Sequence, residues 1–300
     1  SGFERISLQH RNQWLGAGTQ FMTSMGMMEF SIGKQVRRTS AYSGLGVYFI
    51  NDVGGDSKFS IRTGGVTASG VLPLSKAHSI SAGIQVGYSS RSADFSRLTF
   101  FNQWDGTQFD PNIDPNEVNG VNSFSHLDAG AGVAYSYNKD NENTLSASEL
   151  SFQGGFSMQH LNRPTLRYNS LVDDKLPIKI CVHANMRYGL SPESNIEFSA
   201  AQFIQAKYLE TIGGLFYRLK MKSASRVTSF VSDQYFVIGS YFRSTGSIIP
   251  CFFIDIGGLT LGVSYDYELG KIASMYRQSI EVSLKFNFGK RSIFSSSKMR

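Results

Sequence analysis

The sequence predicts an all-β protein and favours an antiparallel, up-and-down transmembrane β-barrel of about 14 strands. Three observations lead to this prediction. Apolar and polar residues alternate over many segments, only 17% of the 300 residues are charged, and the segments have the roughly 9 to 11 residues that cross a bilayer as barrel strands. Successive side chains of a strand point to opposite faces, so alternation indicates a sheet between an apolar and a polar environment. A soluble β-sheet protein has such faces too and is the alternative fold.

The low charge content favours a membrane protein. Soluble proteins carry about 25% charged residues, so the value of 17% indicates that much of the surface does not face water. No run approaches the roughly 18 apolar residues of a transmembrane helix, and the most apolar short stretch, 248–254, contains Pro250. If the chain crosses a membrane, it must do so with strands.

The clearest alternation lies at 80–88, where Ile84 and Tyr88 share one face and Ser81 and Gln85 share the other. The same pattern recurs at 127–137, 178–188, 259–267 and 280–288. With weaker segments added, the predicted strands lie near 4–14, 19–31, 43–51, 59–72, 78–92, 124–137, 145–160, 177–189, 194–205, 208–219, 234–243, 248–256, 258–268 and 276–288.

An even number of strands places both ends of the barrel sequence on one side of the membrane, which we predict to be the periplasm. Outer-membrane barrels have short periplasmic turns and longer extracellular loops. The short connections at 74–77, 138–143, 191–194 and 257–258 alternate with a set that holds the two longest loops, 102–123 and 161–176. The chain is therefore predicted as a single barrel, 1–288, followed by a basic periplasmic tail, 289–300.

Aromatic residues lie near the ends of the apolar faces, as they do in the interfacial girdles of membrane barrels. They are Tyr88, Tyr135, Tyr137, Tyr188, Tyr265, Tyr267, Phe286 and Phe288. The polar faces carry single charged or titratable residues in mid-strand, namely Lys179, His183, Arg187, Glu281 and Lys285. Cys181 and Cys251 have polar-face parity, and we predict free thiols that face the interior.

No pattern in the chain predicts an enzyme, a cofactor or a metal site. Asp110 to Asn116 resembles the start of a calcium loop, but it lacks the glycine at its sixth position and has Val121 where the twelfth-position glutamate belongs. Turn chemistry in an exposed loop explains it better. The five histidines lack metal-ligand spacing, and no G-x-S-x-G segment supports an outer-membrane hydrolase. No basic cluster with interleaved aromatics accompanies the tail, so no nucleic acid is expected.

Several blocks of the sequence resemble the PorP/SprF family, the outer-membrane barrels of the type IX secretion and gliding machinery of Bacteroidetes. The blocks are RNQW at 11–14, GLGVYFINDVGGD at 44–56, the stretch 83–111, HLNRPT at 160–165, 175–188, 261–272 and SIEVSLKFNF at 279–288. The chain departs from the family in two places. An NPA-like block before Ser1 is absent, which suggests that a signal peptide has been removed, and Ile280 stands where a histidine is expected.

The resemblance implies a non-enzymatic component of the bacterial cell outer membrane that works by protein–protein docking in lipid, without a small-molecule substrate. One role anchors the periplasmic ring lipoprotein and its partners. The other assists export or surface attachment of an adhesin with a C-terminal sorting domain. A passive porin-like channel is the alternative. The candidate partner-binding residues are Arg11, Asn12, Gln13, Trp14, Arg91, Asp94, Phe95, Tyr265, Asp266 and Tyr267.

Overall fold

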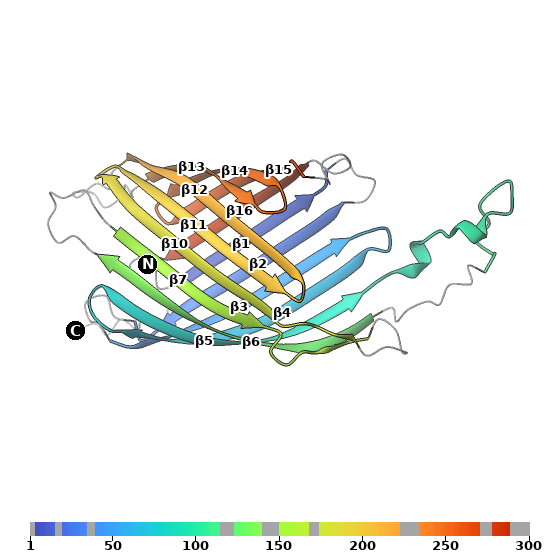
Figure 1. Ribbon diagram of the computed structural model, residues 1–300, viewed down its shortest axis with the longest axis horizontal. Helices are drawn as coiled ribbons and strands as arrows, with labels where there is room; N and C mark the ends of the chain where they lie inside the picture. The colour runs from blue at the N-terminus through green and yellow to red at the C-terminus, as the bar shows by residue number, and fades with distance from the viewer. Residues whose placement is uncertain are drawn as a thin grey trace, which may run out of the picture.

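A computed structural model describes residues 4–15, 20–34, 40–114, 123–139, 150–167, 174–222, 234–270 and 278–288. These residues form a closed antiparallel barrel of 14 strands and a separate two-stranded sheet (Figure 1). The predicted fold class and strand number are confirmed. Across the described ranges, no helix is long and apolar enough to span a membrane.

The barrel strands follow chain order around the wall, and the barrel closes where the first strand pairs with the last. They are β1 (Glu4–Gln13), β2 (Phe21–Ile32), β3 (Tyr42–Gly54), β4 (Phe59–Pro73), β5 (His78–Ser92), β6 (Ser123–Lys139), β7 (Leu150–Gln159), β10 (Lys179–Ser191), β11 (Ser194–Gln205), β12 (Tyr208–Lys222), β13 (Gln234–Arg243), β14 (Ser247–Ile256), β15 (Leu259–Glu268) and β16 (Gln278–Phe288). The sequence did not predict β8 (Thr165–Leu166), β9 (Asp174–Lys175) or the short 3₁₀ helices η1 (Phe95–Arg97) and η2 (Phe101–Gln103).

The barrel has two unlike ends. At one, which we call the terminal end, β1 begins and β16 finishes, with Glu4 paired to Phe288. The opposite, or loop, end carries the two longest connections, 93–122 and 160–178. Connections of only two residues occur at both ends, 192–193 and 257–258 at the terminal end and 206–207 at the loop end. The prediction that the two longest loops share one end is confirmed. The predicted turn 138–143 lies mostly outside the described residues, as does the whole tail 289–300.

The apolar faces of the strands point away from the barrel. On β5, Ile80, Ile84, Val86 and Tyr88 are 43% to 62% exposed on the outer surface. Ser81 and the other residues of opposite parity face inward and are more buried. In water, an apolar belt of this kind would be a large exposed patch, whereas in a bilayer it is the surface that contacts lipid. The fold therefore places the alternation between an apolar outer surface and the lumen.

Strand direction distributes the predicted aromatic residues over both rims of the barrel. β5 and β15 run toward the loop end, which therefore receives Tyr88, Tyr265 and Tyr267. The terminal end receives Tyr135, Tyr137, Tyr188, Phe286 and Phe288. This arrangement matches the aromatic girdles at the two interfaces of an outer-membrane barrel.

The inner wall is bulky on one side and thin on the other. Phe216, Val237, Ile249 and Cys251 form a buried cluster on β12–β14, and Cys181 and Cys251 are free thiols on inward positions, as predicted. A β-carbon on Gly239 would lie 2.4 Å from the Phe216 ring, so only glycine accommodates that ring. The inner face of β3–β6 carries mainly small residues, including Gly44, Gly46, Gly65, Gly83, Gly87, Gly130 and Gly132.

Candidate functional site

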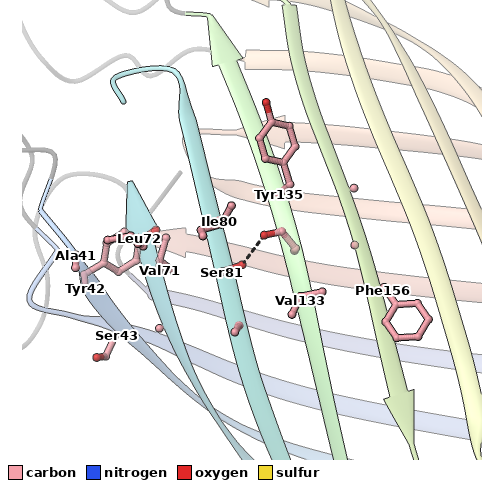
Figure 2. Close-up of a pocket in the computed structure, with 15 residues that line it drawn as sticks. Ala41, Tyr42, Ser43, Val71, Leu72, Ile80, Ser81, Val133, Tyr135 and Phe156 are labelled. Atoms are coloured by element: carbon pink, nitrogen blue, oxygen red, sulfur yellow. Dashed lines mark hydrogen bonds between the residues drawn. The ribbon is translucent and has the colours of Figure 1, made fainter. Parts of the chain in front are cut away.

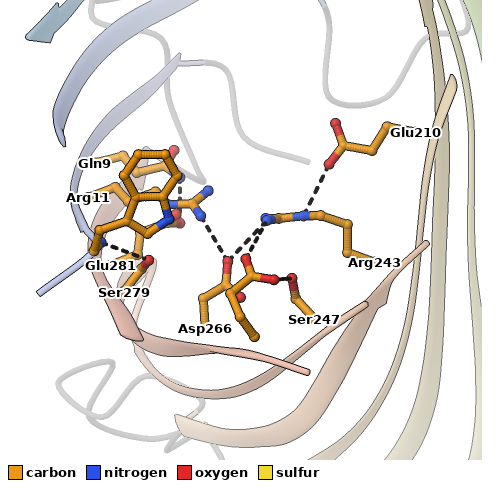
Figure 3. Close-up of polar contacts among 10 residues, drawn as sticks. Gln9, Arg11, Glu210, Arg243, Ser247, Asp266, Ser279 and Glu281 are labelled. Carbon is orange, nitrogen blue, oxygen red and sulfur yellow. Dashed lines mark hydrogen bonds and ion pairs between the residues drawn. The ribbon is translucent and has the colours of Figure 1, made fainter. Parts of the chain in front are cut away.

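The structure brings together two of the sequence blocks that suggested a family. Arg11 of β1 and Asp266 of β15 lie 255 positions apart in the chain, on strands that flank β16. The Nη2 atom of Arg11 donates to Oδ2 of Asp266 at 2.8 Å, and their side chains are 24% and 6% exposed. Both positions face the lumen near the loop end, so this contact joins the beginning and the end of the barrel on its inner wall (Figure 3).

Further residues extend this contact into a network across five strands. Arg243 Nη1 lies 3.2 Å from the same Asp266 oxygen and 3.9 Å from Oε1 of Glu268. Its Nε atom lies 3.1 Å from Glu210, while the buried hydroxyl of Ser247 donates to Glu268 at 2.6 Å. We call Arg11, Glu210, Arg243, Ser247, Asp266 and Glu268 the loop-end network. Its two cations and three carboxylates largely neutralise one another.

The other residues of the N-terminal block stabilise the closure of the barrel. Gln13 pairs with Ser279 across the β1–β16 seam. Asn12 pairs with Ile280, and both of these residues lie on the outer face of the barrel. The backbone N–H of Trp14 donates to the Ser279 hydroxyl at 3.4 Å, and the Trp14 ring packs edge-on against Phe21 with centroids 4.8 Å apart. Trp14 has a φ of 62°, a left-handed conformation that ends the strand.

Arg91, Asp94 and Phe95 lie elsewhere, at the base of the connection 93–122. Asp94 accepts from the Ser96 N–H at 3.2 Å and from Arg97 Nε at 3.1 Å, and its own N–H donates to the carbonyl of Ser57 at 2.8 Å. The Ser96 hydrogen bonds and the Arg97 charge lower the pKa of Asp94. These contacts fix the direction in which the connection leaves β5. The hydrogen bonds and the ion pair of Asp94 stay within its own connection and the turn between β3 and β4, apart from the loop-end network.

Sequence reasoning missed Glu210, Arg243, Ser247 and Glu268. Parity could have indicated Glu268, because it follows Asp266 by two positions and so shares its inward face. Arg243 ends its strand on an inward position, but its partners depend on how neighbouring strands pair. Tyr265 and Tyr267 have outward parity and belong to the loop-end aromatic rim, not to the network.

A second charged group lies on the inner wall toward the terminal end. Glu197 of β11 contacts both Arg187 Nε at 2.7 Å and Arg218 Nε at 2.8 Å. The Arg218 guanidinium also lies 3.8 Å from Asp255 and 4.8 Å above the centre of the Tyr235 ring. Fixed charges therefore line one side of the lumen from end to end, opposite the glycine-rich wall.

These groups have no arrangement that indicates catalysis. His160 Nδ1 lies 2.9 Å from Asp128, but among the described residues no serine or cysteine side chain forms a hydrogen bond with either of them. The part of the chain that the structure describes holds no group of three His, Cys, Asp or Glu residues that could bind a metal ion. Asp110 accepts two hydrogen bonds from Asn112, which is the predicted turn chemistry, and Asn116 lies outside the described residues. The inner wall can instead present a rigid pattern of charge.

The strands β3–β7 carry a depression of about 850 Å³, and its lining includes the outward-facing Ile80, Val133 and Phe156 (Figure 2). Its surface is mainly apolar. These three side chains belong to the apolar outer face of the barrel, and we assign the depression no substrate.

Comparison with known proteins identifies the family. The sequence model of the family described as type IX secretion system membrane protein PorP/SprF matches residues 2–286. The chain belongs to the PorP/SprF family. The resemblance of its sequence blocks is thereby confirmed, and the contact between Arg11 and Asp266 joins two of those blocks in space. A search of curated proteins gave no significant match.

Solved structures similar to this PorP/SprF chain are membrane barrels. A mutant of the TodX monoaromatic hydrocarbon channel has a TM-score of 0.52 at 7% identity, with 96% of this chain and 89% of that chain covered. The CymD monoaromatic hydrocarbon channel has a TM-score of 0.52 at 10% identity, with 97% and 90% covered. At such low identity the similarity shows the fold alone, namely an outer-membrane-type β-barrel.

Proposed function

We propose that this PorP/SprF barrel is a non-enzymatic docking component of the type IX secretion and gliding machinery, with its terminal end in the periplasm and its loop end outside the cell. The asymmetry of the two ends carries this proposal. Outer-membrane barrels place long connections outside and short turns in the periplasm, and the two longest connections here share one end. Most of the residues that lie beyond the barrel wall, and that could recognise another protein, are therefore at the cell surface.

Among the docking roles of the family, this arrangement favours a partner on the extracellular side. That role corresponds to assistance in export or surface attachment of an adhesin with a C-terminal sorting domain. The loop-end network supports it, because Asp266 and Arg243 are 6% and 13% exposed and pair with neighbours, which gives the mouth of the barrel a fixed shape. A ring-anchoring role would instead use the periplasmic turns and the tail 289–300.

A passive porin-like channel is the second candidate, and the glycine-rich inner wall favours it. Residues such as Gly83 and Gly132 on β5 and β6 project no side chain into the lumen, and barrels with more strands than about eight can leave an open interior. Under this alternative the long connections would shape the entrance for solutes rather than bind a protein.

Purification from native outer membranes separates these functions. The docking proposal predicts that a large exported surface protein co-purifies with the tagged full-length chain in mild detergent. Recovery of periplasmic ring lipoproteins alone would move the docking site to the terminal end. Steady, high conductance of the isolated barrel in planar bilayers, with no secretion partner recovered, would refute docking and establish the channel.

The orientation has its own test. Cysteine introduced at Ser57, in the turn between β3 and β4 at the loop end, should react with a membrane-impermeant maleimide on intact cells. Cysteine at Lys76, in the turn between β4 and β5 at the terminal end, should react only after the outer membrane is permeabilised. The reverse pattern would invert the barrel and refute the extracellular assignment of the loop end.

A further inference from the structure

The connection between β5 and β6 carries an ordered projection that the barrel wall does not need. We call residues 94–114 the loop projection. It includes η1 and η2 and extends well beyond the loop end, away from the other strands (Figure 1). Its outer part therefore lies apart from the barrel wall (Figure 1).

Three aromatic side chains of the loop projection are open to solvent. Phe101 is 97% exposed, Trp104 is 53% exposed and Phe109 is 40% exposed. Trp104 and Phe109 form an antiparallel bridge, and residues directly opposite each other in such a pair direct their side chains to the same face. Exposed apolar clusters mark interaction sites, and tryptophan is among the residues that dominate binding energy in protein interfaces.

Hydrogen bonds within the loop projection hold these rings in place. Gln103 is only 6% exposed, and its side chain donates to the carbonyl of Ile113 and accepts from the N–H of Phe100, both at 3.0 Å. Oδ1 of Asp105 accepts from the N–H groups of Thr107 at 2.7 Å and Gln108 at 2.8 Å, which closes the turn between the two bridged aromatics. The aromatic cluster is therefore built in advance of binding, and little ordering is lost when a partner docks.

The charge of the loop projection indicates the chemistry of the partner. Residues 94–114 contain four aspartates and one arginine, a net charge of −3. An anionic lipid surface attracts basic rather than acidic segments, and a second copy would bring the same negative charge against itself. A protein surface with basic residues around an apolar pocket complements both the rings and the aspartates.

We propose that the loop projection is the docking element for an exported or surface protein whose binding site is an apolar pocket with a basic rim. This inference rests on the proposed function, since it places the extracellular docking contact on Phe101, Trp104 and Phe109. Trp104 and Phe109 fill the pocket, Phe101 contacts its edge, and the carboxylates of Asp105 and Asp110 face its basic rim.

Site-specific photo-crosslinking in cells of the native bacterium tests the contact. The full-length chain carries p-benzoylphenylalanine in place of Phe101, and a matched control carries it in place of Tyr208, which is 82% exposed at the same end of the barrel. The proposal predicts an adduct with one exported protein, through a peptide that contains lysine or arginine beside apolar residues. Adducts with lipopolysaccharide, adducts with a second copy of the chain, or a yield no greater than at Tyr208 would each overturn it.

Substitutions then separate the roles of the rings and the charges. Trp104→Ser should lower the affinity for the crosslinked protein at least about tenfold, as expected for a central interface tryptophan. The double variant Asp105→Asn and Asp110→Asn keeps oxygen acceptors for the turn hydrogen bonds but removes two charges. It should slow association about tenfold at low salt, with little difference at 1 M salt. An affinity that Trp104→Ser leaves unchanged would refute the proposal.

Co-purification distinguishes failure of this inference from failure of the proposed function. Each variant is first checked for the compact, heat-modifiable migration of a folded barrel, so that misfolding is not mistaken for lost binding. If the exported partner is recovered equally with wild type and with Trp104→Ser, docking stands and the loop projection is not its site. If wild type recovers no partner, both proposals fail.

Discussion

Arg243 is the residue on which the loop-end network most depends, and Arg243→Met tests this directly. Methionine keeps the aliphatic length of the side chain and removes the guanidinium. That group contacts Glu210, Asp266 and Glu268 from one point on the inner wall. Its loss leaves Asp266 with Arg11 as its remaining ionic partner in the network and leaves Glu268 with the Ser247 hydroxyl.

The expected loss of stability follows from the burial of each contact. Asp266 and Glu268 have side chains that are 6% and 10% exposed, and removing one partner of a buried ion pair costs about 3 to 5 kcal/mol. Glu210 is 40% exposed, so the loss of its contact with Arg243 contributes little to the change in stability. Because Arg11 still neutralises Asp266, we expect the free energy of unfolding to fall by about 2 to 4 kcal/mol, below the full range for an unpaired buried charge.

Urea unfolding of the refolded barrel in detergent micelles, followed by its heat-modifiable migration on gels, measures this change. The matched control is Arg97→Met. Arg97 contacts Asp94 at 3.1 Å, a distance similar to those in the network, but the two side chains are 56% and 49% exposed, so the loss should be much smaller than for Arg243→Met. Equal losses in the two variants, or a loss below about 1 kcal/mol for Arg243→Met, would refute the view that the network stabilises the mouth.

Three further predictions follow from the fold and the loop projection. Gly239→Ala should destabilise the barrel by about 1 to 3 kcal/mol in urea unfolding, because its β-carbon would lie 2.3 Å from a backbone oxygen, whereas Gly213→Ala, with no atom within 4 Å, should have little effect. Ile84→Arg on the outer face should destabilise the barrel in lipid vesicles by about 2 to 4 kcal/mol. Gln85→Arg, at the inward neighbour, should destabilise it less. Equal losses of stability in the two variants would show that Ile84 does not lie on the apolar face. Hydrogen bonds from Gln108 and Thr107 lower the pKa of Asp105 from 3.8, so the carboxylate should stabilise its turn above pH 3.8 and lose this effect as the pH falls further through the lowered pKa. The fluorescence of Trp104, measured in a Trp14→Phe background because Trp14 is the other tryptophan of the chain, should then change only below pH 3.8 and should not titrate when Asp105→Asn is added.

The strands could be predicted from the sequence because each one separates the same two environments. Ile84 faces outward and Gln85 faces inward, and this contrast repeats along the chain with a period of two, which no other regular structure produces. The loop asymmetry was predictable for a related reason, since it requires only a correct count of strands. Deviations from this regular pattern, such as the two-residue strand β8, left no comparable signal.

The loop-end network could be predicted only in part. Arg11 and Asp266 were candidates because their sequence blocks resembled a family, but nothing in the sequence indicated that they touch. Their contact depends on the register of β1 and β15 against β16, and a shift of one residue would turn one of them outward. Glu210 and Arg243 belong to no such block, so only the pairing of strands revealed them.

The closure between β1 and β16 has a consequence for how the protein is made. These strands pair from Glu4 with Phe288 to Gln13 with Ser279, so the first strand of the barrel must wait for the last before its outer edge is paired. Until then two strand edges carry unpaired backbone groups, which the hydrocarbon core of a membrane does not tolerate. The ion pair of Arg11 and Asp266 spans β16 and can form only once that strand is in place. We therefore expect ribosome-stalled or truncated chains that lack β16 to be substrates for degradation rather than partly inserted barrels.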